Sequence, residues 1–420
     1  MSASARSAMP WLVVAGVLVA ALSLRGPVVA PTPVMRDIEQ DLGIGSATAG
    51  LLTTAPVLMF ALMTPVAALV IRRAGAEAAL MITLLGVLAG TLLRAVPGFP
   101  MLLAGMVVIG ASITVGNVVI PVIIRRDVPP DRVGIVTASY AATLNVGSLC
   151  TSLFTAPIAE AVGWELALLA WLVLTVGAVA LWGAHLRRLR RAGEASGERF
   201  SGTARAGGPE RGGGIDPDTV TGPMPAVSRS ARSAVRRLPA WLLLAAFGLQ
   251  VAIYYALSTW LPTLTADEFG LDAASAGALS SVFQGVAIVG AFVVPVLTRL
   301  TRPIVPTIVI GACWLLLTVG MLAAPEWTWV WLCFGAIAHS GGFVVIFSTL
   351  VTVARDDAEA TTLSALVQGG GYGIGAFGAP AVGALHELTG DWAAPLVLMV
   401  VLAVLYCVAL VSAMAAAARA

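Results

Sequence analysis

The sequence has no lysine and few charges of any kind. All 24 basic residues of the 420-residue chain are arginines, and charged residues make up 11% of the chain. Hydrophobic residues make up 59%, and the mean hydropathy is +0.94. A soluble domain needs a much larger share of polar residues. The composition therefore excludes a soluble domain and predicts a polytopic helical membrane protein.

Cysteine is also scarce. The four cysteines lie far apart in apolar segments, at Cys150, Cys313, Cys333 and Cys407. None has the spacing of a metal site or of a disulfide framework, so we interpret them as small buried apolar side chains. We expect no metal.

Signs of a cofactor or of enzyme chemistry are missing too. The glycine runs at 341–342 and 369–375 follow no strand and precede no Gly-Lys-Ser/Thr, so they favour close helix packing or a flexible gating helix over phosphate binding. No nucleophile–base pair stands out. We expect neither a cofactor, nor an enzyme, nor a nucleic-acid partner.

Twelve apolar segments are long enough to cross a bilayer, which takes about 20 residues. The predicted spans are 11–33, 46–71, 78–96, 100–124, 134–159, 165–186, 240–263, 273–298, 304–323, 327–353, 361–386 and 392–416. The first could be a signal peptide, but it continues past Ala30 and eleven spans follow it, so we expect an uncleaved helix. The predicted fold is an all-α membrane protein.

Arginine is distributed unevenly among the connections. The N-terminus, the connections after even-numbered spans and the C-terminus hold most arginines, whereas the opposite connections hold only Arg36 and Arg94 beside acids such as Asp37, Asp267 and Glu387. The positive-inside rule therefore predicts cytoplasmic termini in a bacterial-type inner (plasma) membrane.

Residues 187–238 differ from the rest, being rich in Arg, Gly, Pro and Ser. We predict a disordered cytoplasmic linker between two six-helix bundles, at 1–186 and 239–420. A regulatory or lipid-binding role is the alternative, because the segment begins with a cluster at the membrane edge: Arg187, Arg188, Arg190 and Arg191.

The two halves repeat each other. Ala47-Thr-Ala-Gly50 matches Ala274-Ser-Ala-Gly277 at the start of the second span of each half. The fifth span of each half carries an amide residue twelve positions before an Ala-Pro pair: Asn145 before Pro157, and Gln368 before Pro380. The repeat predicts two parallel six-helix units related by an axis along the membrane normal.

Three stretches carry a resemblance to a known family. They are Leu24–Pro27, Gly248–Pro262 and the run from Leu363 through Tyr372 to Trp392. With them the chain resembles the major facilitator superfamily, and within it the cyanate permease-like branch, which includes 2-nitroimidazole transporters. The resemblance implies transport of a small anion or small polar molecule between two six-helix bundles.

The chain departs from the wider superfamily at one motif. Near Gly75, where that superfamily usually has an aspartate, this chain has Arg72 and Arg73. The general motif therefore adds nothing to the prediction, while the fold prediction does not depend on it.

Arg25 is a cation inside the first predicted span, and the prolines at 27, 31 and 33 loosen the helix after it. Such a charge costs roughly 2.5–3.5 kcal/mol at the bilayer centre on insertion scales, so it tends to face a bundle interior and mark a substrate path. Its planar fork suits a carboxylate or another anion. The alternatives are an arginine held by freed backbone carbonyls or one that extends to the outer interface.

No acid lies inside any predicted span, although the chain has 22 of them. Proton pumps usually need a buried titratable relay, so this absence limits the candidates. Glu160 and Glu387 end spans and are better read as solvated caps. His339 could couple protons, bind substrate or be a neutral ring between helices. We interpret His386, at a span end, as structural or gating.

Uncharged polar residues form a second candidate group. Gln250 and Tyr254 are four residues apart, as are Gln368 and Tyr372, so each pair shares a helix face. The complete set of predicted substrate-binding residues is Arg25, Asn117, Tyr140, Asn145, Gln250, Tyr254, Gln284, His339, Gln368 and Tyr372. The alternative is that these amides and phenols join helices by interhelical hydrogen bonds.

These features together predict a secondary active or facilitative transporter in the lipid bilayer, working as a monomer. We expect a small anionic or electronegative solute, with protons as a candidate coupling ion. The alternatives are an efflux pump for neutral or cationic drugs, which a net basic cavity disfavours, and a non-transporting membrane sensor.

Overall fold

The computed structural model describes residues 11–129, 132–201, 236–290, 292–302, 304–355 and 357–417. In these ranges the chain forms helices and no strand. Eleven helical stretches there are long and apolar enough to cross a membrane. The predicted all-α membrane fold is confirmed.

The described part of the first half contains nine α-helices and a 3₁₀ turn. Their bounds are α1 Trp11–Val29, η2 Thr32–Val34, α2 Met35–Leu42, α3 Ser46–Ala49, α4 Leu51–Ala74, α5 Ala76–Leu93, α6 Phe99–Asp127, α7 Val133–Val162, α8 Trp164–Ala170 and α9 Leu172–Ser201.

The second half follows the same plan. Its elements are α12 Leu238–Phe269, α13 Ala273–Gly290, α14 Val293–Leu300, α15 Ile304–Ala323, η3 Pro325–Trp327, α16 Thr328–Val353, α17 Asp357–Gly375, α18 Gly378–Thr389 and α19 Ala393–Ala417. The predicted span 361–386 is formed by α17 and α18 in succession, and 273–298 by α13 followed by α14.

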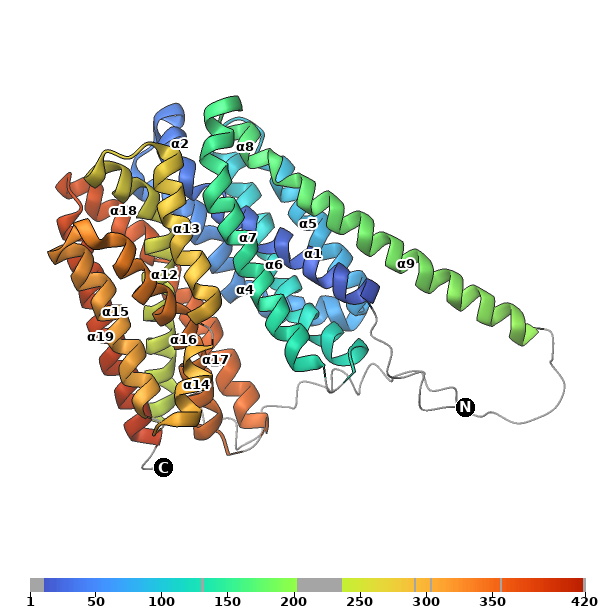
Figure 1. Cartoon of the computed structure of the whole chain (residues 1–420). Helices are drawn as coiled ribbons and strands as arrows, with labels where there is room; N and C mark the ends of the chain where they lie inside the picture. Colours follow the sequence, from blue (N-terminus) through green and yellow to red (C-terminus); the bar gives the residue numbers. More distant parts are fainter. Residues whose placement is uncertain are drawn as a thin grey trace.

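The two halves form two bundles side by side (Figure 1). They meet where α7 packs along α13, α4 along α17 and α3 against α18. We call the end of the molecule that holds α2 the α2 end, and the opposite end, which holds α14, the α14 end. The innermost helices are α12 and α1. In α12, 78% of an apolar stretch of 18 residues is buried, and the corresponding share is 67% for the segment Trp11–Leu42, which begins with α1. Side chains at the middle of these two helices therefore face protein.

Proline determines where two of the helices break. Pro31 has no N–H for the Pro27 carbonyl, and α1 ends at Val29 before the 3₁₀ turn η2. Pro380 likewise has no N–H for the Ala376 carbonyl, and the chain breaks between α17 and α18 at that point. Both freed carbonyls are satisfied by side chains: Arg94 donates to the first at 2.7 Å, and the Thr54 hydroxyl to the second at 2.8 Å.

The repeated glycines lie at close contacts between the two halves. A Cβ on Gly277 would lie 2.7 Å from the main-chain oxygen of Ser152, in the other half. A Cβ on Gly50 would lie 3.1 Å from Cα of Pro380, again in the other half. The repeat therefore reflects a matched pair of contacts between α13 and α7 and between α3–α4 and α18.

Helix α9 continues to Ser201, so residues 187–201 of the predicted linker are helical. This stretch contains Arg, Ala and Glu, which are good helix formers, and its start is continuous with a membrane-crossing helix. Residues 202–235 lie outside the described residues. That the remaining residues form a disordered cytoplasmic linker between the bundles stays a prediction.

Candidate functional site

Arg25 lies near the C-terminal end of α1, four residues before Val29, and is half-buried between the two halves. Its Nη2 donates a hydrogen bond of 3.2 Å to the Tyr254 hydroxyl on α12, and its Cζ lies 5.6 Å from the centre of that ring. Among the described residues no carboxylate pairs with it. Arg25 is thus a cation without a carboxylate partner among the described residues.

A cavity of about 300 Å³ opens beside Arg25. Both halves line it, through α1 and α7 on one side and α12, α16 and α17 on the other. Its polar and aromatic lining residues are Arg25, Asn145, Phe247, Gln250, Tyr254, Tyr255, His339, Ser340, Phe343 and Tyr372. The volume is at the small end of ligand pockets, which suits a solute of modest size.

One wall of the cavity is a stack of two rings. Tyr254 and His339 lie face to face, with 3.7 Å between ring centres and 10° between planes. Nε2 of Gln250 donates to the main-chain oxygen of His339 at 3.2 Å. Within the described residues, His339 Nδ1 and Gln250 Oε1 are buried and have no hydrogen-bond partner. Buried polar atoms in this state are free to bind a solute or water.

The part of the cavity nearer the α14 end is aromatic. Phe247 makes edge-to-face contacts with Tyr372 at 5.2 Å and with Phe343 at 6.1 Å between ring centres. Tyr372 also meets Phe60 of the other half at 5.6 Å. The site therefore combines one cation, a few polar groups and flat apolar surfaces.

The space on the other side of Arg25 is nearly closed. Toward the α2 end it shrinks to about 10 Å³ between Val28, Thr32, Thr53 and Ser258. A single water needs about that much room, so no solute passes there in this conformation. The buried hydroxyl of Thr259 donates to that of Thr53 across the two halves at 2.8 Å.

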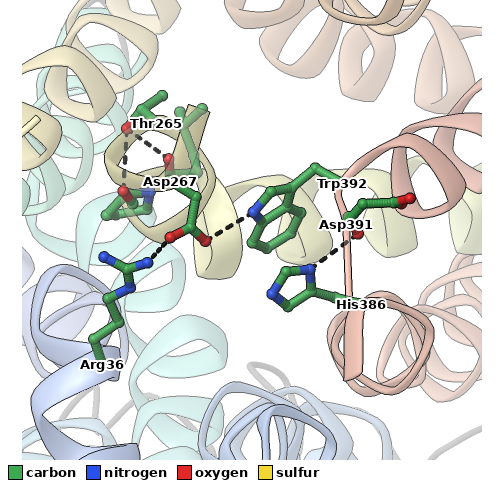
Figure 2. Close-up of polar contacts among 8 residues, drawn as sticks. Arg36, Thr265, Asp267, His386, Asp391 and Trp392 are labelled. Atoms are coloured by element: carbon green, nitrogen blue, oxygen red, sulfur yellow. Dashed lines mark hydrogen bonds and ion pairs between the residues drawn. The ribbon is translucent and has the colours of Figure 1, made fainter. Parts of the chain in front are cut away.

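Further contacts seal the α2 end. Figure 2 shows the ion pair of Arg36 with Asp267 across the halves, and Trp392 donating to the other carboxylate oxygen at 2.8 Å. His386 stacks on Trp392 at 4.0 Å between ring centres. The contacts of Arg25, Ala47, Thr54, Thr259 and Arg36 with the other half lie at Arg25 or on its α2 side. The cavity is thus closed at the α2 end and extends toward the α14 end.

The structure brings together six of the ten predicted site residues, namely Arg25, Asn145, Gln250, Tyr254, His339 and Tyr372. The other four lie outside the described lining. Asn117 is exposed, Tyr140 and Gln284 are buried, and Gln368 donates to the Ser364 hydroxyl at 2.9 Å. Gln368 and Tyr372 share a helix face, but only Tyr372 reaches the cavity.

Sequence reasoning did not single out several lining residues. Tyr255 and Ser340 are each adjacent to a predicted residue, and both line the cavity. In the sequence, Phe247 and Phe343 cannot be distinguished from the other apolar residues of their spans. Only the packing of α12 against α16 shows that they form a wall.

Comparison with known proteins agrees with this arrangement. The sequence profile of the Major Facilitator Superfamily matches residues 13–377. The chain belongs to the Major Facilitator Superfamily. It is therefore a multi-pass membrane transporter of a small molecule and not an enzyme.

Two relatives align with nearly the whole chain. The "2-nitroimidazole transporter" of Escherichia coli (strain K12) is 29% identical over 404 residues, covering 94% of this chain and 93% of that protein. The "Uncharacterized transporter YycB" of Bacillus subtilis (strain 168) is 28% identical over 402 residues, covering 93% and 90%.

Solved major facilitator structures share the fold. A bacterial homologue of the human lysosomal transporter Spinster, in an inward-facing and occupied conformation, matches with a TM-score of 0.67 and 16% identity, over 97% of this chain and 96% of that one. The peptide transporter POT in complex with sulfate matches with a TM-score of 0.69 and 15% identity, over 96% and 95%. At these identities the likeness concerns the fold alone.

Proposed function

We propose that this major facilitator transporter moves a small anionic or electronegative solute by alternating access. Cyanate, a small carboxylate and a nitro-heterocycle are the candidate classes. The observation that carries the proposal is Arg25, a cation at the end of a cavity with no described carboxylate to neutralise it. An anion would pair with it at low dielectric, whereas a cation would be repelled.

The aromatic wall supports flat solutes within this class. Rings prefer offset stacking or edge-to-face contact, and Phe247, Tyr254 and Tyr372 offer both faces and edges. The similarity to a protein named a 2-nitroimidazole transporter supports a nitro-heterocycle in particular. Such a ring would place its nitro oxygens on Arg25 and its plane against the aromatic side chains.

The distribution of arginine supports an orientation. The α14 end carries Arg125, Arg126, Arg299, Arg302 and Arg355, whereas the α2 end carries Arg36 and the buried Arg94. We propose on the positive-inside rule that the α14 end and both termini face the cytoplasm. The conformation described here would then be open inward. We further propose that a single copy transports, because both walls of the cavity come from one chain.

The test is uptake into proteoliposomes that hold the purified protein. Labelled cyanate, benzoate and 2-nitroimidazole are offered with and without a pH gradient, to the native protein and to Arg25→Ala. We expect one probe to accumulate and the variant to lose that uptake at least tenfold. An effect of the pH gradient would identify proton coupling.

The matched control is Arg302→Ala, an exposed arginine at the α14 end. It removes the same charge without touching the cavity, so its uptake should be native. Normal uptake by Arg25→Ala would overturn the assignment. Binding of a probe without accumulation would instead identify a sensor.

A further inference from the structure

The ligand-facing side of Arg25 is already occupied by a side chain of the transporter itself. Arg25 Nη2 donates to the Tyr254 hydroxyl at 3.2 Å, and Tyr254 is only 3% exposed. The Tyr254 ring is fixed by its stack on His339, so the hydroxyl stands beside the guanidinium without rotation of a flexible chain. A neutral oxygen thus sits where the proposed function places an anion.

This hydrogen bond also joins the two halves. Arg25 belongs to α1 and Tyr254 to α12, the innermost helix of each bundle. The contacts of Ala47, Thr54, Thr259 and Arg36 with the other half lie on the α2 side, away from the cavity. Unlike these contacts, the Arg25–Tyr254 bond joins two residues that line the cavity, so a solute in the cavity can reach it.

We propose that the Tyr254 hydroxyl is an internal competitor of the substrate: it occupies Arg25 while the cavity is empty, and the substrate replaces it. The inference rests on the proposed function, since it requires Arg25 to bind the solute. The exchange is favourable because an anion adds charge–charge attraction and can accept two parallel hydrogen bonds from the planar guanidinium, whereas the Tyr254 hydroxyl offers one neutral acceptor oxygen. The empty transporter meanwhile avoids leaving a half-buried cation without an acceptor.

The exchange has two consequences. A solute with weak acceptor atoms cannot displace the hydroxyl, so Tyr254 sets a threshold of acceptor strength for binding. Replacement also removes a bond between the halves, and a ligand that breaks a contact made in only one conformation shifts the balance between conformations. Binding would in this way favour the rocking of the two bundles.

The decisive variant is Tyr254→Phe, which keeps the ring on His339 and removes only the oxygen. Affinity is measured by calorimetry on the purified full chain in detergent, with cyanate, benzoate and 2-nitroimidazole as probes. We expect the probe that binds the native protein to bind Tyr254→Phe about three- to tenfold more tightly, because it no longer displaces a hydrogen bond. If Tyr254 instead donates to the solute, affinity falls, and that result overturns the proposal.

The matched control is Tyr406→Phe. Tyr406 is fully buried in the second half, outside the described lining of the cavity, so loss of its hydroxyl should leave affinity unchanged.

Arg25→Ala separates the proposed function from the competitor role of Tyr254. Unchanged affinity in Arg25→Ala overturns the proposed function, whereas weaker binding in Arg25→Ala together with weaker binding in Tyr254→Phe overturns only the competitor role.

A second measurement needs no ligand. Spin labels at Arg125→Cys and Arg302→Cys report the separation of the halves at the α14 end, in a chain whose native cysteines are replaced. Without the Arg25–Tyr254 bond we expect the population at the native separation to fall about threefold or more relative to other separations. An unchanged distribution in Tyr254→Phe would show that the bond does not hold the halves together.

Discussion

The guanidinium of Arg94 donates to the main-chain oxygen of Pro27 at 2.7 Å, on the very carbonyl that Pro31 leaves without a helical donor. Its other terminal nitrogen donates to the oxygen of Leu168 at 2.9 Å, where α8 gives way to α9. Arg94 is 1% exposed and joins α1, α5 and α8. It therefore fixes the last turn of the helix that carries Arg25, immediately before the break.

Arg94→Met is expected to destabilise the transporter while leaving its charge selectivity intact. Two carbonyls would lose their donor, each at roughly 1–3 kcal/mol. Removing a buried cation with no acid partner offsets part of this cost. We therefore expect the free energy of unfolding to fall by about 1–3 kcal/mol. Thermal unfolding in detergent measures the loss as a lower midpoint.

Arg125→Met, at an exposed arginine of the α14 end, is the control and should unfold like the native protein. Arg94→Lys should recover part of the midpoint, since an ammonium supplies donors but not the fork that spans both carbonyls. An unchanged midpoint in Arg94→Met would mean that the freed carbonyls find other donors.

The role of Arg94 shows how far sequence reasoning reached. The prolines after Arg25 predicted a loosened helix whose backbone groups need partners, and the structure contains that break. Sequence reasoning considered an arginine on freed carbonyls as an alternative for Arg25, but the arginine with that role is Arg94. Arg94 lies 67 residues beyond Pro27, and only the packing of α5 against α1 brings it there.

The candidate site shows the same limit. Spacing correctly put Gln250 and Tyr254 on one helix face, and both line the cavity. Spacing did the same for Gln368 and Tyr372, but a shared face is wider than the cavity, and Gln368 turns to Ser364. Periodicity identifies the face of a helix. It does not determine which turn of the helix lies at the depth of Arg25.

Gly277→Ala is expected to slow transport by obstructing closure of the α2 end. Its Cβ would lie 2.7 Å from the main-chain oxygen of Ser152, and a backbone atom cannot move aside cheaply. Overpacking of this kind costs about 1–3 kcal/mol. Destabilising the closed conformation by about 1.4 kcal/mol lowers its population relative to the open conformation about tenfold. The initial rate of uptake, normalised to folded protein, is the measurement.

Gly50→Ala tests the matched contact in the other half. Its Cβ would be 3.1 Å from Pro380, a milder clash, so we expect a smaller decrease. Gly177→Ala is the control, because nothing lies within 4 Å of its added Cβ. Native rates in both interface variants would show that the halves do not need this close approach.

Arg36→Ala is expected to change transport less than threefold, despite the ion pair with Asp267. The Arg36 side chain is 47% exposed and that of Asp267 22%, and exposed pairs contribute about 0–1 kcal/mol. Asp267 also keeps the hydrogen bond from Trp392. A double-mutant cycle of Arg36→Ala and Asp267→Ala on uptake rates, at low and high salt, measures the coupling.

The threonine pair is the more important contact in the same seal. Thr53 and Thr259 are buried, so their hydrogen bond is not screened by solvent. Thr259→Val leaves the Thr53 hydroxyl without this partner and should slow uptake more than Arg36→Ala. A strong effect of salt on the native rate would reverse this ranking, because it would show that the exposed ion pair dominates closure.

His339 is expected to act through its flat ring, and substitution can separate this from proton coupling. The ring lies 3.7 Å from that of Tyr254 and nearly parallel to it, which holds Tyr254 against Arg25. His339→Phe keeps a flat ring and cannot titrate, so transport should persist within about threefold, with its dependence on the pH gradient unchanged. His339→Ala removes the support and should lower uptake roughly tenfold, corresponding to about 1.4 kcal/mol. If His339→Phe instead abolishes the effect of the pH gradient while solute binding survives, the imidazole carries the coupled proton and stacking is its lesser role.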